Sequence, residues 1–280
     1  MINFSFWNHV DAVLVINLDE RKDRWEAFKS ATSQLIPSDK IHRVSATMGR
    51  ELPGYGKLPW FRGRKRDLTW AARGGCTLSH RSACLIAQEN NWDNILILED
   101  DVELLPNYQE KIKQLPQMLW NSGFAWDICF LGYTEPQKPF KIMAKTASCE
   151  LVQFSGCNAT HAYLLNSNAR DWIITQLPEP DQIWQWTARY RAIDRWYRRN
   201  LSRNFVLTAL SNSLFNQYYG FSDIECRKKS LTDEVCVTNI SVQSKPKGLF
   251  TWHLKIKVLK NRMLLAYDYL RATSKRLNGF

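Results

Sequence analysis

The sequence predicts an α/β protein in which a mixed, mostly parallel sheet is flanked by helices. Short apolar runs of strand length occupy residues 12–18 and 95–98, and a polar turn and a helical pattern follow each of them. Continuous apolar runs are typical of strands that are buried on both faces. The alternation of strands and helices up to about residue 175 favours one doubly wound domain, in which ligands bind beyond the carboxyl ends of the strands.

The remaining elements follow from turn residues and periodicity. Residues 49–75 are rich in glycine and basic residues, and we interpret them as one long loop. The helix after this loop is expected to start near Ser79, the next one to have Pro106 in its first turn, and a later one to be capped by Ser167. Further strands are expected at residues 126–133, 150–154 and 161–166.

Composition restricts the partners without choosing among them. The net charge of +11 attracts nucleic acid, anionic lipid or a phosphorylated glycan, and the 12 Trp residues suit sugar rings, membrane interfaces and single-stranded nucleic acid equally well. Seven cysteines without CxxC spacing indicate reduced core residues. No apolar stretch has the length of a membrane span, and the N-terminus lacks a basic leader, so a cytoplasmic protein is expected.

The strongest local signal is the acidic triplet Glu99, Asp100 and Asp101 directly after the strand at residues 95–98. Three consecutive carboxylates repel one another unless a cation or solvent offsets their charge. A hard divalent cation that bridges two phosphates would fit this position and stabilise a nucleoside-diphosphate leaving group. The alternative is a solvated acidic turn that only ends the strand.

Five short blocks in this order resemble glycosyltransferase family 25, which includes bacterial lipooligosaccharide galactosyltransferases and collagen galactosyltransferases. The blocks are NLDERKDRW, GCTLSHRSA, ILILEDDV, THAYLL and AIDRW, at residues 17–25, 75–83, 95–102, 160–165 and 192–196. The resemblance implies a GT-A-like nucleotide-sugar-binding fold, a UDP-sugar donor with galactose as the first expectation, Mn²⁺ or Mg²⁺, and inversion to a β-glycoside.

The resemblance also assigns site residues. It implies Asp101 as the main metal ligand, with Glu99 acting directly or through water. The residues expected to bind the nucleotide sugar are Asn17, Arg21, Arg24, Ser79, His80 and Asp100. For the two arginines the alternative is a solvated helix face, and for His80 it is a structural role. Ser79 is expected at a helix start, where backbone N–H groups would face the donor.

Asp194 matches the acid of the family's fifth block and is the expected general base. The alternative is a structural ion pair with Arg191, Arg195 or Arg198. The chain departs from the family at Ala192, where a proline is usual, and at Arg73, where the family has an acid before its glycine. FSDIE at residues 221–225 resembles the family's closing block, and we interpret it as active-site rim or as packing.

Residues 1–244 are expected to form the catalytic domain, and residues 245–280 a basic amphipathic tail. Basic residues interleaved with aromatic and aliphatic ones predict docking on an anionic membrane surface, at the inner face of the cytoplasmic membrane. The alternative is a helix packed on the core. The sequence thus predicts hexose transfer to a glycan such as lipooligosaccharide or lipopolysaccharide.

Two other functions stay open. One is a non-catalytic protein of the same fold that binds a nucleotide sugar or a glycan. The other is nucleic-acid binding, which the basic and aromatic stretch at residues 183–203 favours. Because no nucleic-acid-binding motif is found, nucleic acid is not expected as a partner.

Overall fold

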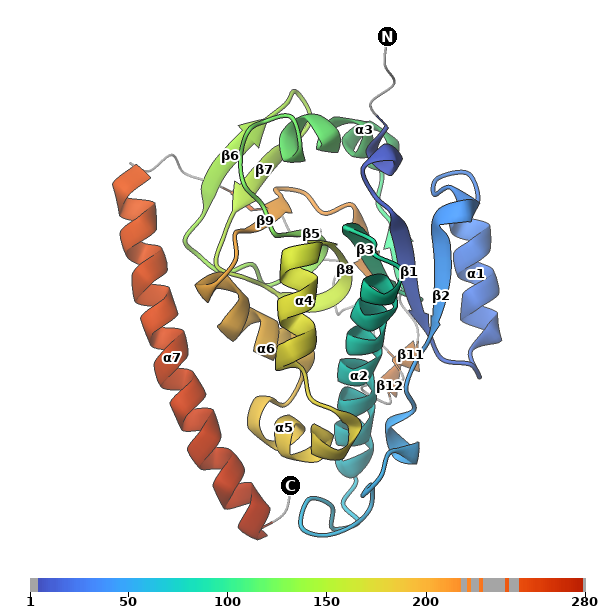
Figure 1. The fold of residues 1–280 in the computed structure, drawn as a ribbon, viewed down its shortest axis with the longest axis vertical. Coiled ribbons are helices and arrows are strands. Elements are labelled where there is room, and N and C mark those ends of the chain that lie inside the picture. The colour runs from blue at the N-terminus through green and yellow to red at the C-terminus, as the bar shows by residue number, and fades with distance from the viewer. Residues whose placement is uncertain (1–4, 218–220, 223–226, 229–239, 242–246, 279–280) are drawn as a thin grey trace.

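In the computed structural model, which describes residues 5–217, 221–222, 227–228, 240–241 and 247–278, the chain forms an eight-stranded mixed sheet flanked by helices (Figure 1). The strand order is β2-β1-β3-β8-β5-β9-β7-β6, and six strands run in one direction while β8 and β7 run in the other. The strands of this sheet are β1 (Ala12–Asn17), β2 (Ile41–Ser45), β3 (Asn94–Glu99), β5 (Ile128–Thr134), β6 (Lys141–Lys145), β7 (Glu150–Gln153), β8 (Asn158–Asn166) and β9 (Leu207–Leu210). The predicted fold class is therefore confirmed.

Seven α-helices are present in the described part of the chain. They are α1 (Lys22–Thr32), α2 (Asp67–Glu89), α3 (Tyr108–Leu119), α4 (Ser167–Gln176), α5 (Ile183–Tyr190), α6 (Ile193–Asn200) and α7 (Lys247–Asn278). Two small sheets pair β4 (Val102–Leu104) with β10 (Phe215–Gln217) and β11 (Phe221–Ser222) with β12 (Arg227–Lys228). Among these residues, no helix combines the length and the apolar character needed to cross a membrane.

The central strands are buried on both faces, which explains their continuous apolar sequences. In β1, Leu14 and Ile16 belong to a core shared with α2 and α4, whereas Val13 and Val15 belong to a second core that includes residues of α1 and α3. Successive side chains of a strand point to opposite faces, so each strand supplies both cores. Figure 1 shows α2 and α4 in front of the sheet.

Helix α2 corrects two predictions. It begins at Asp67, so the expected loop over residues 49–75 is wrong in its last part, and so is the expected helix start near Ser79. The Asp67 carboxylate holds the turn before the helix by accepting the backbone N–H groups of Arg62 (3.1 Å) and Arg64 (2.9 Å).

The glycines that suggested a loop serve close packing. A Cβ at Gly75 would lie 2.3 Å from the backbone oxygen of Thr47, and a Cβ at Gly49 would lie 1.8 Å from the oxygen of Ala71. Both distances are far shorter than van der Waals contact. Glycine at these positions therefore lets the segment around Thr47 lie directly on the middle of α2.

Two helix starts also differ from the sequence prediction. Asn166, not Ser167, caps α4, because its side-chain oxygen accepts the N–H of Ala169 at 2.9 Å. Pro106 precedes α3, which begins at Tyr108. The five cysteines that the structure describes are free thiols, as predicted, whereas Cys226 and Cys236 lie outside the described residues.

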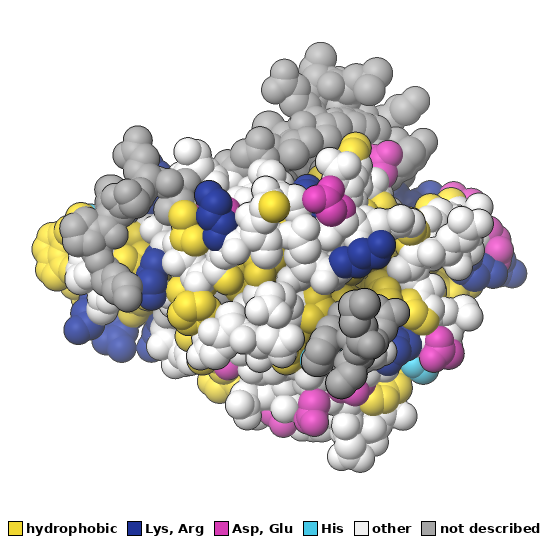
Figure 2. All heavy atoms as spheres, turned by 90° about the horizontal axis from the view of Figure 1, so that it is seen from above, with side chains coloured by type: hydrophobic (Ala, Val, Ile, Leu, Met, Phe, Trp, Pro, Cys, Tyr) yellow, Lys and Arg dark blue, Asp and Glu magenta, His cyan; other side chains and the backbone are white. Residues whose placement is uncertain are grey.

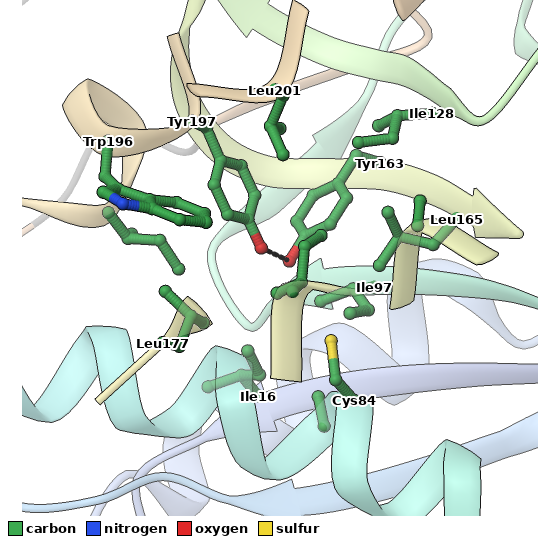
Figure 3. Packing of buried hydrophobic residues seen from close by; sticks show 14 of the residues in the cluster. Ile16, Cys84, Ile97, Ile128, Tyr163, Leu165, Leu177, Trp196, Tyr197 and Leu201 are labelled. Atoms are coloured by element: carbon green, nitrogen blue, oxygen red, sulfur yellow. Dashed lines mark hydrogen bonds between the residues drawn. The ribbon is translucent and has the colours of Figure 1, made fainter. Parts of the chain in front are cut away.

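The helices of the second half of the chain, α4 to α7, form a layer beside the sheet. Tyr197 of α6 reaches Tyr163 of β8 through a hydroxyl–hydroxyl hydrogen bond of 3.2 Å inside the core (Figure 3). Helix α7 lies along α5 and α6 at the left of Figure 1. Its buried Asp268 forms ion pairs with Arg195 (2.9 Å), with Arg199 and with Arg271. The helical layer is thus held together by one carboxylate and three guanidinium groups.

Candidate active site

The acidic triplet lies where two neighbouring strands end. In the parallel pairing of β1 with β3, Ile16 is opposite Glu99, and the N–H of Asp100 donates to the Ile16 oxygen at 3.1 Å. A cavity of about 370 Å³ opens beyond this edge and is bordered by all three acids. Because strand ends of an α/β sheet form the usual ligand-binding edge, we call this space the donor-side cavity.

Asp100 is held in the wall of this cavity. It accepts hydrogen bonds from Asn17 Nδ2 at 2.6 Å and from Arg24 Nη1 at 3.0 Å. Burial raises the pKa of Asp100, and the contacts with Asn17 and Arg24 offset only part of that effect. Asn17 itself is 1% exposed, does not border the cavity, and accepts Arg43 Nε at 2.7 Å. Asn17 was predicted to bind the donor, but in the structure it contacts Asp100 and does not border the cavity.

Glu99 borders both the donor-side cavity and a second cavity. Its carboxylate lies 3.4 Å from His80 Nε2 and accepts the Thr160 hydroxyl at 3.1 Å. Burial by itself would raise the pKa of Glu99, but its hydrogen bonds to His80 and Thr160, together with the charges of His80 and His161, outweigh burial and lower it. Glu99 is thus kept as a carboxylate at the point where the two cavities meet.

His80 combines a structural position with a place at the site. It is fully buried, and its Nδ1 lies 2.8 Å from the Tyr163 hydroxyl, which continues to Tyr197. These contacts connect Glu99 through the core to α6. His80 therefore has structural contacts in the core, as the alternative prediction expected, and it also borders the donor-side cavity.

The other predicted donor residues border the donor-side cavity, but with different surroundings. Arg21 pairs with Asp23 at 2.9 Å, and this hydrogen-bonded contact lowers the pKa of Asp23 to about 2. Ser79 lies inside α2, where its hydroxyl donates to the Gly75 oxygen and accepts the Thr47 N–H, both at 2.8 Å. Its position in the middle of the helix excludes the expected role of a helix start.

The second cavity has a volume of about 480 Å³ and contains Asp194. Its border also includes four arginines, Arg73, Arg191, Arg195 and Arg198. Asp194 lies in the first turn of α6 and accepts the N–H of Arg195 at 2.5 Å. It forms no ion pair with any residue that the structure describes, since Arg195 pairs with Asp268 instead. The two cavities share Cys76, Glu99 and Gln217.

The chemistry of this edge suits a cation. Burial raises the pKa of the Cys76 thiol, and the nearby charges of Glu99, Asp194 and Asp101 raise it further. Such a concentration of carboxylates stabilises positive charge, and the carboxylates of Asp101 and Glu99 are the oxygen ligands that Mg²⁺ and Mn²⁺ prefer. Within the described residues, one group of three or more possible ligands has its ligand atoms within 4.8 Å of one another; it consists of Cys76, His80 and Glu99, and Asp101 is not part of it. A role of Asp101 as a ligand therefore stays a prediction. The residues present therefore fit a divalent cation next to Glu99.

Sequence reasoning missed several residues that border the site. Arg50 was placed in the expected loop, and Gln217 lies on β10 without any motif around it. Thr160 begins the block THAYLL and Arg73 marks a departure from the family pattern, so both carried a signal. The block at residues 221–225 falls mainly outside the described residues.

Comparison with known proteins identifies the family. A family model described as glycosyltransferase family 25 (LPS biosynthesis protein) matches residues 10–179, which is more than half of the chain. The chain belongs to glycosyltransferase family 25. The match includes the acidic triplet, Ser79 and His80, whereas Asp194 lies beyond its end.

Three proteins show how far similarity extends around this family 25 domain. Procollagen galactosyltransferase 1-B of Xenopus laevis is 31% identical over 149 residues, and the alignment spans 46% of this chain but 23% of that protein. A glycosyltransferase involved in glycosylation of the major capsid of PBCV-1 has a TM-score of 0.34 at 11% identity, covering 76% of this chain and 95% of that one. Mouse xyloside xylosyltransferase 1 has a TM-score of 0.31 at 14% identity, covering 70% and 71%.

Proposed function

We propose that this family 25 glycosyltransferase moves galactose from UDP-galactose to a glycan of the lipooligosaccharide or lipopolysaccharide class, with inversion and with the help of a divalent cation. The observation that carries the proposal is the pair of cavities, about 370 and 480 Å³, that meet at Glu99. A transferase needs separate spaces for donor and acceptor that join at the reacting carbon.

The donor-side cavity suits a nucleoside diphosphate. Arg21, Arg24 and Arg50 border it and can donate to phosphate oxygens. Asp101 and Glu99 would hold Mn²⁺ or Mg²⁺ there, and a bound cation would neutralise charge on the leaving diphosphate. Asp100 is less suited to the cation because both of its oxygens already accept hydrogen bonds from Asn17 and Arg24.

The second cavity suits an acceptor, and we call it the acceptor-side cavity. In the proposed reaction an acceptor hydroxyl oxygen bonds to the anomeric carbon while the bond from that carbon to the diphosphate oxygen breaks. Asp194 takes the proton of the hydroxyl. Its carboxylate is suited to this role because it forms no ion pair with a residue that the structure describes. The arginines around it would bind anionic groups of the acceptor.

UDP release tests the proposal. The protein is incubated with UDP-galactose, UDP-glucose and other UDP-sugars, with Mn²⁺ or with excess EDTA, and with and without lipooligosaccharide. We expect UDP release to be fastest with UDP-galactose, to increase with acceptor and to stop in EDTA. Binding of UDP-galactose without release under any condition would instead identify a non-catalytic nucleotide-sugar-binding protein.

A further inference from the structure

The side of helix α7 that faces away from the protein is apolar. Large hydrophobic residues on this side are spaced three, four or seven positions apart, and their exposed fractions run from 38% to 75%. These residues are Leu249, Trp252, Ile256, Leu259, Met263, Leu270 and Leu277. We call them the apolar stripe of α7. At a helical period of 3.6 residues they lie along one side for the whole length of the helix.

The opposite side of α7 faces the protein and is mixed, since it buries Phe250, Leu265 and Ala272 together with polar residues. Asp268 and Asn261 are buried at 0% and 2% exposure, and Asn261 Nδ2 donates to the Arg198 oxygen at 3.3 Å. Arg271 donates to the backbone oxygens of Ala188 (3.1 Å) and Arg189 (2.7 Å). The core therefore contacts the mixed side of the helix and leaves the apolar stripe for another contact. An exposed apolar patch of this length on a soluble domain marks a binding surface.

Charge decides which surface fits the stripe. The basic residues on the exposed part of the helix are Lys255, Lys260, Arg262 and Arg276, and they flank the stripe. The one acid of residues 247–278 is Asp268, which is buried. Against a second copy of α7, the flanking positions would bring like charges together, whereas paired helices use opposite charges there. An anionic lipid surface complements both the charges and the apolar residues.

We propose that the apolar stripe of α7 and its flanking basic residues dock the protein on an anionic lipid bilayer, with the helix lying in the plane of the interface. Figure 2 shows hydrophobic side chains next to Lys and Arg side chains at the left edge of the molecule, the side on which α7 lies. Trp252 and Tyr267, exposed by 59% and 60%, are residue types that bind at the membrane–water interface.

Docking would also bring the acceptor-side cavity close to the lipid, with the width of α7, about 10 Å, between them. Arg195 and Arg198 border that cavity and both contact α7, through Asp268 at 2.9 Å and Asn261 at 3.3 Å. An acceptor glycan attached to a membrane lipid would then enter the cavity from the docked side. This part of the inference rests on the proposed transfer reaction, whereas docking itself does not.

Sedimentation with vesicles tests the docking. The full-length protein is mixed at low salt with vesicles of phosphatidylglycerol or of phosphatidylcholine. We expect binding to phosphatidylglycerol, weaker binding as salt rises, and little binding to phosphatidylcholine. Replacing Lys255 and Arg262 together by Gln should weaken binding about 30-fold, since each basic residue near an anionic surface contributes a factor of about five. Leu259→Ser with Met263→Ser should weaken it about tenfold or more.

The test includes a matched control and three results that would contradict the proposal. Leu58→Ser removes an equally exposed leucine (69%) outside α7 and should bind vesicles like the wild type. Equal loss with Leu58→Ser, or no binding to phosphatidylglycerol at low salt, would overturn the proposal. So would a dimer in sedimentation velocity that the Leu259→Ser, Met263→Ser pair dissociates, because the stripe would then bind a second copy.

Activity separates docking from the proposed reaction. The variants of the stripe should keep the wild-type rate with a soluble, delipidated acceptor and lose rate with acceptor embedded in vesicles. A wild-type protein that docks but never releases UDP would contradict the proposed function and leave docking intact. Equal rates of variant and wild type on both acceptors would contradict the link between docking and acceptor entry.

Discussion

The donor-side and acceptor-side cavities share Glu99 but are supported in different ways. The donor side is built on the ends of β1 and β3, which pair directly, and on α2, which lies against the Thr47 segment through Gly75. The acceptor side is built on α6, which is held by Tyr197 in the core and by the Asp268 ion pairs of α7. The donor side thus depends on backbone packing and the acceptor side on a charge cluster far along the chain.

This difference teaches that the two sides can be disturbed separately. Residues of the donor side are close in the sheet, so changes there should affect UDP-sugar affinity and metal dependence. On the acceptor side, Asp194, Arg195 and Arg198 lie on α6 in the second half of the chain, so changes there should affect turnover and acceptor affinity. Changes at the proposed reacting residues test that separation first, and changes at the residues that hold each side in place test it next.

The largest effect is expected at Asp101. Asp101→Asn keeps the volume of the side chain and removes the charge proposed to hold the cation, so kcat/KM should fall about 10²–10³-fold. UDP release measured against Mn²⁺ concentration checks this, together with a thermal melting curve that should stay near wild type. Glu103→Gln is the matched control, because Glu103 is exposed on β4 and borders neither cavity. Full activity of Asp101→Asn, or full activity in excess EDTA, would contradict the metal site.

A smaller effect, confined to turnover, is expected at Asp194. Asp194→Asn should lower kcat about 10²-fold by removing the general base, with the affinity for UDP-galactose unchanged. Steady-state kinetics measures kcat, and calorimetric titration with UDP-galactose measures the affinity. Asp181→Asn, an exposed acid of the preceding segment, serves as control. Normal turnover by a folded Asp194→Asn protein would remove Asp194 from the mechanism.

The support of the acceptor side should depend on Asp268. Asp268→Asn leaves Arg195, Arg199 and Arg271 without their common carboxylate, so unfolding should require about 3 kcal/mol less free energy. Urea denaturation measures this loss. Because Arg195 borders the acceptor-side cavity, the KM for acceptor should rise while that for UDP-galactose stays constant. Asp39→Asn, at an exposed acid, should change neither value. An equal rise in both KM values would mean that the two sides are not separable.

The support of the donor side should show the smallest effect. Gly75→Ala would place a Cβ 2.3 Å from the Thr47 oxygen, and such overpacking costs about 1–3 kcal/mol of stability. Thr47 and Gly49 border the donor-side cavity, so UDP-galactose affinity should fall as well. Gly248→Ala in α7 meets no atom within 4 Å and should be neutral or slightly stabilising. If Gly75→Ala matches Gly248→Ala in both measurements, close packing of α2 does not support the donor side.

The amino-acid sequence by itself determined the sheet strands around the site and the position of the acidic triplet. An apolar run such as residues 12–17 can be buried on both faces only as a central strand, and polar residues after it must lie at the sheet edge. The sequence did not show that the two strands are neighbours; their parallel pairing in the structure brings Asn17 and Glu99 to Asp101 together. The family blocks added the expected chemistry of that edge.

Only the tertiary structure decided which side chains are committed to other partners. Local pattern could not show that Gly75 lies inside a helix, because the contact that requires glycine comes from Thr47. It could not show that Asp100 is bound to Arg24, or that Arg195 pairs with Asp268 while Asp194 has no ion pair with a residue that the structure describes. Nor could it show which side of α7 faces the core. Partners 73 to 83 residues apart are set by how elements pack, and local composition does not record that distance.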